Sequence, residues 1–300
     1  MTRLTVRHVT LYRYRRPVGF GEHRLMFRPR DSHDLRLIRT LLTIEPAAEV
    51  RWLHDVFSNS IAIAGFRDQA AELRFESEIE IEHYGLDYPE FLLEPAARTY
   101  PFSYSSDEVP DLGRTMERHY PDPDRRVDAW VKGFLQDGGK TDTADLLGRI
   151  TRAINHTFIY QPRYTIGTRS PIETLEHGSG TCRDLALFMM EAVRSLGLAS
   201  RFVSGYLYEP LLDPPTAEGG PAGAGIQGGG ATHAWVQVYL PGAGWVEFDP
   251  TNGLVGGANL IRVAVARDPT QAVPLQGNYL GDPEDFIDME VDVNVTAAGA

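Results

Sequence analysis

The sequence predicts an α+β protein in which a β-rich, sandwich-like N-terminal domain precedes a helical segment and a second set of strands. Apolar and polar residues alternate with a period of two over much of residues 1–95, which is typical of antiparallel strands with one buried face. Apolar residues recur at helical spacing between residues 110 and 197, and alternation returns afterwards. We therefore expect two domains, residues 1–100 and residues 101–300, connected through a proline-rich stretch at residues 89–110.

In the N-terminal domain we expect strands at residues 4–14, 34–45, 60–66 and 71–83. The first should end before Pro17, because proline cannot donate a hydrogen bond to a neighbouring strand. In the last, mostly apolar side chains alternate with glutamates, so this strand should present an acidic face to solvent.

The second domain is predicted to begin with helices and to end with strands. Helices are expected at residues 125–135, 142–156, 171–177 and 182–196, and strands at residues 201–208, 232–240, 245–249 and 289–295. Residues 214–231 are rich in Gly, Pro and Ala, which predicts a mobile loop. This loop leads directly into the strand that begins near His233, so we expect it beside any site built on that residue.

The only cysteine, Cys182, lies where a glycine-rich turn enters an apolar helix, in the segment GSGTCRD at residues 178–184. Thr181 and Asp184 have the spacing of a capping box, so Cys182 should occupy the first turn of this helix. Unpaired N–H groups and the helix dipole favour negative charge in a first turn, and hence a thiolate. A lone cysteine is more often a small core residue, so this position alone does not decide for catalysis.

A nucleophilic cysteine needs a base to take its proton and a group to orient that base. His233 opens a predicted β-hairpin and Asp249 closes it, so the two ends of one ribbon can bring them together. Their order after a cysteine at a helix start favours a catalytic interpretation of all three residues.

The hairpin must have a particular register for His233 and Asp249 to meet, because side chains alternate between faces along each strand. If Leu240 paired with Trp245, the two side chains would point to opposite faces of the sheet. A turn of three or five residues, or one β-bulge, would place Trp235 opposite Asp249 and His233 one diagonal step away. We therefore predict an odd turn or a bulge.

Three segments together resemble the motifs of the bacterial transglutaminase-like family of papain-like cysteine enzymes. They are GTCRD at residues 180–184, HAWVQVYLPGAGW at residues 233–245 and FDPT at residues 248–251. The resemblance continues in residues 262–268 and 274–279, and residues 12–14, 17–18 and 28–30 resemble the β-rich domain that precedes the catalytic domain in this family.

The resemblance implies Cys182 as nucleophile, His233 as general base and acid, and Asp249 as the orienting carboxylate. It also implies a papain-like core, in which the cysteine helix packs against an antiparallel sheet, and acyl transfer through a thioester. The Cys182 backbone N–H is the first candidate donor of an oxyanion hole. Further oxyanion or substrate candidates are Tyr160, Gln161 and Tyr164, and Trp235 is a candidate shield of the His–Asp pair, with a plain core role as the alternative.

The family resemblance leaves three functions open. The first is a cysteine hydrolase of peptide or amide bonds with a possible transferase ability, and the second is a glutamine-crosslinking transglutaminase. The third is a non-catalytic peptide-binding or scaffold protein on the same fold, against which the presence of all three triad residue types argues. No residue that we can name decides between water and an amine as the group that attacks the thioester.

The composition limits the partners and the compartment. A net charge of −12 and a pI near 5.2 argue against nucleic acid or an anionic membrane as the main partner. The family resemblance implies a peptide or amide substrate as the partner. No signal peptide, membrane span or cysteine pair is recognised, and we expect a cytoplasmic protein. No metal or cofactor is expected, since no segment resembles a calcium-binding EF-hand loop.

Overall fold

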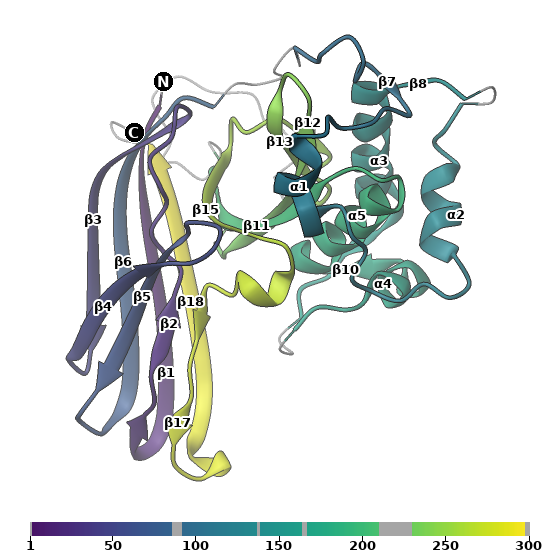
Figure 1. Cartoon of the computed structure of the whole chain (residues 1–300). Coiled ribbons are helices and arrows are strands. Elements are labelled where there is room, and N and C mark those ends of the chain that lie inside the picture. Colours follow the sequence, from purple (N-terminus) through teal and green to yellow (C-terminus); the bar gives the residue numbers. More distant parts are fainter. Residues whose placement is uncertain (1, 86–91, 137–138, 164–166, 210–229, 298–300) are drawn as a thin grey trace, which may run out of the picture.

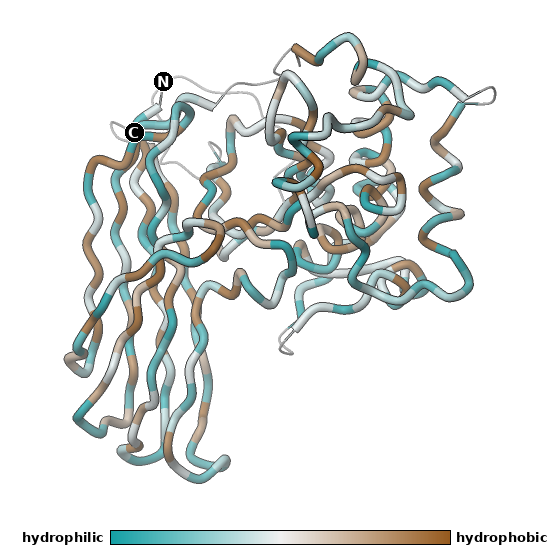
Figure 2. The backbone as a smooth tube through the Cα atoms, viewed as in Figure 1, coloured by the Kyte–Doolittle hydropathy of each residue, from teal (hydrophilic) through white to brown (hydrophobic). Residues whose placement is uncertain are grey.

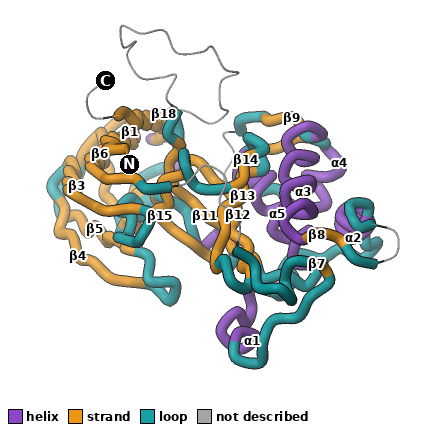
Figure 3. The backbone as a smooth tube through the Cα atoms, turned by 90° about the horizontal axis from the view of Figure 1, so that it is seen from above, coloured by secondary structure: helices purple, strands orange, loops and turns teal. Residues whose placement is uncertain are grey.

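The computed structural model describes residues 2–85, 92–136, 139–163, 167–209 and 230–297. Long strands lie on one side of the molecule and the helices on the other (Figure 1). A further sheet stands between them, which is seen most clearly from above (Figure 3). Residues 210–229, which include most of the predicted glycine-rich loop, lie outside the described residues.

Both ends of the chain contribute to the first sheet, which has five strands. These are β1 (Thr2–Phe20), β3 (Leu35–Glu45), β6 (Ala70–His83), β17 (Tyr279–Leu280) and β18 (Phe286–Ala297). The predicted C-terminal strand therefore exists, as β18, and it runs antiparallel to β1. The expected division at residue 100 assigned this strand to the second domain, whereas its hydrogen bonds join it to the sheet of the N-terminal domain.

Strand β1 continues through Pro17 to Phe20, so the expectation that it ends before Pro17 is wrong. Its pairing with β6 shifts between Arg13 and Val18, and its pairing with β18 shifts just after Arg13. Pro17 lies in this irregular stretch, where the N–H that proline lacks is not needed by a ladder. The strand can therefore include a proline without losing a hydrogen bond.

The second sheet covers one end of the first. It contains β2 (His23–Leu25), β4 (Ala48–His54), β5 (Ser60–Phe66) and β16 (Leu275–Gln276). A hydrophobic core between the two sheets includes Phe20, Phe27, Ala64, Leu73 and Phe75. The N-terminal domain is thus two packed sheets, of which β2 and β4 were not predicted.

The alternation predicted for residues 71–83 is confirmed in β6. Leu73, Phe75, Ile79 and Ile81 are fully buried, and the glutamates between them lie on the opposite, more exposed face. Figure 2 shows hydrophobic and hydrophilic residues alternating along the long strands of this domain. Arginines of β1 neutralise part of the acidic face, for example Arg7, which pairs with Glu76 at 2.6 Å.

The helices and the third sheet form the rest of the molecule. The helices are α1 (Glu108–Leu112), α2 (Arg126–Lys132), α3 (Thr143–Thr157), α4 (Pro171–His177) and α5 (Cys182–Ser195). The sheet has the strand order β14 (Leu254–Val255), β13 (Gly244–Asp249), β12 (His233–Leu240), β11 (Ser200–Leu207) and β15 (Leu260–Ala266). Two small ribbons pair β7 (Thr99–Tyr100) with β8 (Thr141–Asp142), and β9 (Ile159–Tyr160) with β10 (Ser179–Gly180).

The third sheet is buried on both faces. On one face α5 packs against β11 and β12, and the largest hydrophobic core joins this helix, α3 and the sheet. On the other face Tyr206, Ile261 and Val263 pack against Leu4 and Ile79 of the first sheet. Burial on both faces explains why β11 and β12 read as nearly continuous apolar runs. No helix among the described residues is long and apolar enough to cross a membrane.

Candidate active site

Helix α5 begins as its sequence predicts. The Thr181 hydroxyl accepts a hydrogen bond from the Asp184 N–H at 3.3 Å, and the Asp184 carboxylate accepts from the Thr181 N–H at 2.9 Å. This reciprocal capping box makes Cys182 the first residue of the helix. Asp184 is fully buried, and its charge is balanced by Arg163 at 2.7 Å.

The Cys182 side chain is 8% exposed and borders the main hydrophobic core. Its backbone N–H belongs to the first turn, where the helix supplies no carbonyl partner. The neighbouring Arg183 donates to the carbonyl oxygens of Pro269 and Ala272 and stacks on Phe202. The helix start is thus anchored on both sides of the cysteine, by Asp184 and by Arg183.

The hairpin of β12 and β13 has the predicted odd turn. Leu240 pairs with Gly244, which leaves the three residues 241–243 in the turn, and Val236 pairs with Phe248. Gly242 has a φ of 90°, and a Cβ there would approach the Leu92 carbonyl oxygen to 2.5 Å. Glycine is therefore required for this turn, and the turn sets the faces of both strands.

His233 and Asp249 share a face of the hairpin and form a hydrogen bond of 2.8 Å between Nε2 and Oδ2. Both side chains are completely buried. The carboxylate also accepts from the Thr251 N–H at 2.9 Å and from the Asn252 side-chain amide at 2.7 Å. Asp249 therefore accepts hydrogen bonds on both oxygens, and these bonds fix its orientation independently of the imidazole.

The electrostatics of the pair favour an imidazolium beside a carboxylate. Burial lowers the pKa of His233, but the charge and hydrogen bond of Asp249, followed by the neighbouring Cys182, raise it to about 10. Burial raises the pKa of Asp249, but His233, Asn252 and Thr251 lower it below its ordinary value overall. The two shifts agree in direction, since each charge stabilises the other.

The hydrogen bond to Asp249 also assigns the two nitrogens of the imidazole. An ionised carboxylate only accepts hydrogen bonds, so His233 Nε2 carries a proton. Nδ1 is buried and has no hydrogen-bond partner among the described residues. Cys182 lies close enough to His233 to contribute to the rise of its pKa. Nδ1 is thus the atom that can take a proton from Cys182 and return it.

The predicted oxyanion or substrate residues Tyr160, Gln161 and Tyr164 differ in their relation to Cys182. Tyr160 lies in β9 opposite Gly180, and its pKa is raised to about 12 by burial and by the nearby Cys182. The Gln161 side chain is exposed and accepts from the Ser179 hydroxyl at 3.3 Å, while its backbone N–H donates to the Gly180 carbonyl. Tyr164 lies outside the described residues. Of these, only Tyr160 is brought to the cysteine by an interaction in the described structure.

Trp235 is buried beside the His233–Asp249 pair. Its ring stacks on the His233 imidazole with the centroids 6.0 Å apart and an angle of 26° between the planes. Its indole N–H donates to Glu247. Trp235 therefore lies beside the imidazole and belongs to a buried core, while its role as a shield of the His–Asp pair stays a prediction.

Several residues that support the His233–Asp249 pair were not predicted. Asn252 could have been suspected from the sequence Asp-Pro-Thr-Asn, since an aspartate after a strand commonly accepts hydrogen bonds from the turn that follows. Glu247 and Arg262, which pair at 2.6 Å, gave no local signal because they belong to different strands. Within the described residues, no group of three or more His, Cys, Asp or Glu side chains is arranged to hold a metal ion.

Comparison with known proteins agrees with this architecture. Residues 4–82 match the family described as bacterial transglutaminase-like N-terminal region, and residues 131–250 match the transglutaminase-like superfamily. The chain thus has an N-terminal β domain and a transglutaminase-like core.

Two mycobacterial relatives are uncharacterized proteins. One from Mycobacterium tuberculosis (strain H37Rv) is 28% identical over 302 residues, covering 97% of this chain and 92% of the relative. One from Mycobacterium leprae is 34% identical over 134 residues, which is 45% of this chain and 44% of that protein, so this match spans less than half of its length.

A crystal structure of a candidate cysteine protease from Cytophaga hutchinsonii has a similar fold. It superposes with a TM-score of 0.69 at 16% identity, covering 98% of this chain and 90% of that chain. At this level of identity the likeness concerns the fold, and it extends over both the N-terminal sheets and the core.

Proposed function

We propose that this chain, which belongs to the transglutaminase-like superfamily, is a cysteine-dependent enzyme that hydrolyses peptide or amide bonds through a thioester on Cys182. The observation that carries the proposal is the buried hydrogen bond between His233 and Asp249, which leaves Nδ1 of the imidazole unpaired in a site where Cys182 is near enough to raise the pKa of His233. A papain-like arrangement, in which one helix supplies the cysteine and one sheet supplies the other two residues, follows from α5 packing on β12.

In the first half of the reaction, the Cys182 sulfur attacks the carbonyl carbon of the substrate after its proton has passed to His233 Nδ1. The negative charge on the substrate oxygen would be stabilised by the Cys182 backbone N–H at the helix start. When the C–N bond breaks, the imidazolium returns its proton to the leaving amine. The products of this half are a thioester and a free amine.

In the second half, a water molecule attacks the thioester carbon and His233 Nδ1 takes its proton. The C–S bond breaks, the carboxylic acid leaves, and the proton returns to the Cys182 sulfur. If an amine replaced water, the same steps would form a new amide, which is the crosslinking alternative. The third alternative, a non-catalytic binding protein, does not account for a buried His–Asp pair whose imidazole pKa is raised in part by the only cysteine.

Incubation with a complex peptide mixture, followed by mass spectrometry of new termini, tests the proposal. The wild type is expected to create new termini, and Cys182→Ala should lower the rate by at least about a thousandfold because the nucleophile is gone. Thermal unfolding of both proteins controls for damage to the fold. Equal cleavage by wild type and Cys182→Ala would overturn the proposal.

A parallel incubation with glutamine-containing casein and a fluorescent primary amine separates the alternatives. Label incorporated without new termini would identify crosslinking as the reaction. Peptides retained by both the wild type and Cys182→Ala, with neither cleavage nor labelling, would identify a binding protein. We expect cleavage to dominate over labelling.

A further inference from the structure

The face of the hairpin that carries His233 and Asp249 repeats their arrangement one step further along. Asp249 of β13 accepts from the ring N–H of His233, which lies diagonally across on β12. Two residues away on each strand, Glu247 accepts from the ring N–H of Trp235 in the same diagonal relation. Each acid therefore orients one ring, and the two rings stack on each other.

Glu247 is the centre of a buried polar network. Besides Trp235, its carboxylate accepts from the Gln237 side chain at 2.6 Å and from the Arg262 guanidinium at 2.6 Å. Burial raises the pKa of Glu247 above its ordinary value, and the charge of Arg262 and the three hydrogen bonds offset only part of that rise. All three of these neighbours are hydrogen-bond donors, so the geometry suits the ionised carboxylate.

The guanidinium of Arg262, whose charge balances Glu247, is also bound by residues of the N-terminal domain. The Arg262 guanidinium also contacts the Asp34 carboxylate at 3.2 Å and the Ser32 hydroxyl at 3.4 Å. Burial lowers the pKa of Arg262, but Glu247 and Asp34 more than offset this and raise it overall. The strand that carries Arg262 is fixed by the same domain, since the Asn59 side chain bonds both the N–H and the carbonyl of Val265.

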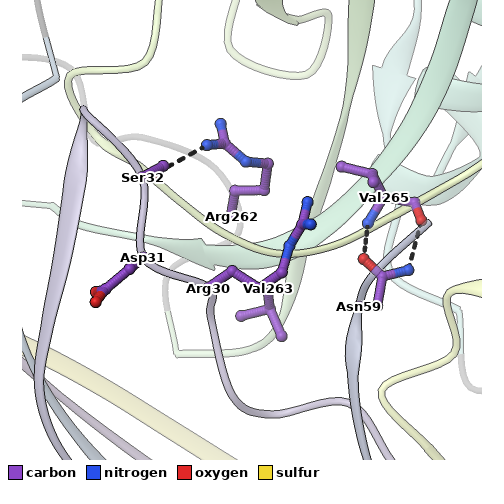
Figure 4. A pocket seen from close by; sticks show the side chains of 7 residues that line it. All are labelled: Arg30, Asp31, Ser32, Asn59, Arg262, Val263 and Val265. Atoms are coloured by element: carbon purple, nitrogen blue, oxygen red, sulfur yellow. Dashed lines mark hydrogen bonds between the residues drawn. The ribbon is translucent and has the colours of Figure 1, made fainter. Parts of the chain in front are cut away.

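A cavity of about 150 Å³ lies beside Arg262, lined by residues of the N-terminal domain and of β15. Figure 4 shows the side chains that line it. Ser32 reaches Arg262 from the N-terminal domain, and Asn59 pairs with the backbone of Val265. Among the described strands of the third sheet, β15 lies at an edge and pairs with β11. The N-terminal domain therefore supplies the contacts that this edge lacks, next to the arginine that pairs with Glu247.

We propose that Glu247 and Arg262 are positioning residues that hold Trp235 against the His233 imidazole, and that Asp34 of the N-terminal domain completes this device. The inference rests on the proposed function only in its assignment of His233 as the base. The tilt of the ring decides where Nδ1 points, and small displacements of a reacting group cost large factors in rate. The N-terminal domain would thus help to position the His233 imidazole, through the contact of Asp34 with Arg262.

The test compares Glu247→Gln, Trp235→Phe, the double variant of these two, and Asp34→Asn. Glu247→Gln keeps the shape but removes the charge that holds Arg262, and Trp235→Phe keeps an aromatic ring but removes its N–H. The matched control is Glu76→Gln, because Glu76 also accepts from an arginine at 2.6 Å but lies on the outer face of β6. Melting temperature, kcat and KM for a cleaved peptide, and the pH dependence of alkylation of Cys182 by iodoacetamide are measured for each.

Glu247→Gln and Trp235→Phe are each expected to lower kcat by about tenfold or more with KM little changed, because a misdirected imidazole affects the reacting atoms and not peptide binding. The double variant should be no slower than the slower single variant, since both act through one ring. Asp34→Asn, at the partly exposed end of the network, should lower kcat by a few fold. Alkylation at pH 6 should slow in the same order, and Glu76→Gln should match wild type.

Alkylation requires no substrate, so it separates the two ideas. If no peptide is cleaved but Glu247→Gln still slows alkylation relative to Glu76→Gln, the proposed function fails and the positioning role stands. If peptides are cleaved and Glu247→Gln, Trp235→Phe and Asp34→Asn all behave like Glu76→Gln, the positioning role is overturned. Should Glu247→Gln not fold, Asp34→Asn alone gives the same decision. A lower melting temperature with unchanged kcat and alkylation would mark the network as purely structural.

Discussion

Replacing Asp249 by asparagine tests how the carboxylate acts on the imidazole. In the wild type, Oδ1 accepts from the Thr251 N–H, and Oδ2 accepts from His233 Nε2 and from the Asn252 side chain. An asparagine that keeps its oxygen toward the backbone must turn its NH₂ group toward His233. Two donors would then face each other in a fully buried site.

The imidazole can relieve this conflict only by moving its proton from Nε2 to Nδ1. Nδ1 then presents an N–H to Cys182 and cannot accept its proton. We expect kcat to fall by about a thousand- to ten-thousandfold, which corresponds to about 4–5 kcal/mol of lost transition-state stabilisation. KM should change little, because Asp249 is buried behind His233. The unfolding free energy should fall by about 1–3 kcal/mol, the usual cost of a buried unsatisfied donor.

The assay measures kcat, KM and urea-induced unfolding for wild type and Asp249→Asn. Asp285→Asn is the matched control, because Asp285 is also a buried carboxylate, paired with Arg16 at 2.9 Å in the turn before β18. This control should lose stability without losing kcat. An Asp249→Asn variant with kcat within about twofold of wild type would refute the assignment of the orienting role.

Two further predictions concern stability. The pKa of His233 is raised from 6.5 to about 10 in the folded protein, so its stabilising contribution is complete below pH 6.5 and is lost as the pH rises toward 10. The free energy of unfolding, measured by urea titration, should therefore decline between pH 6.5 and pH 10. The decline should be less steep in His233→Gln. Gly205→Ala should destabilise the fold by about 1–3 kcal/mol and lower kcat, because the new Cβ would lie 2.1 Å from the Ile261 carbonyl oxygen and 2.7 Å from the Trp235 ring. Thermal unfolding measures the loss. Gly65→Ala is the control, because its Cβ would lie 4.0 Å from its nearest neighbour.

Local patterns in the sequence predicted those features that depend on a few neighbouring residues. The capping box of Thr181 and Asp184 placed Cys182 at a helix start, since both partners lie within one turn. The odd turn between β12 and β13 followed from requiring His233 and Asp249 to share a face, because a hairpin register is fixed by its turn.

Features that depend on pairing between distant parts of the chain could not be predicted from local patterns. The alternation in residues 289–295 indicated a strand, but nothing in it specified β1 as the partner, since edge strands of many sheets would suit the same pattern. The contact of Arg262 with Glu247 and Asp34 joins three segments that are far apart in the sequence. No periodicity encodes such a contact, and only the fold brings these charges together.

The central claim is that the buried His–Asp pair activates the only cysteine, and the rate of its alkylation at pH 6 tests this most directly. An ordinary thiol is only about 0.3% ionised at that pH, so it reacts slowly with iodoacetamide. Comparison of wild type with His233→Gln keeps the access to Cys182 similar while removing the base. We expect wild type to react at least about tenfold faster than His233→Gln at pH 6, with the difference shrinking as the pH rises to 9. Equal rates for the two proteins at pH 6 would contradict it.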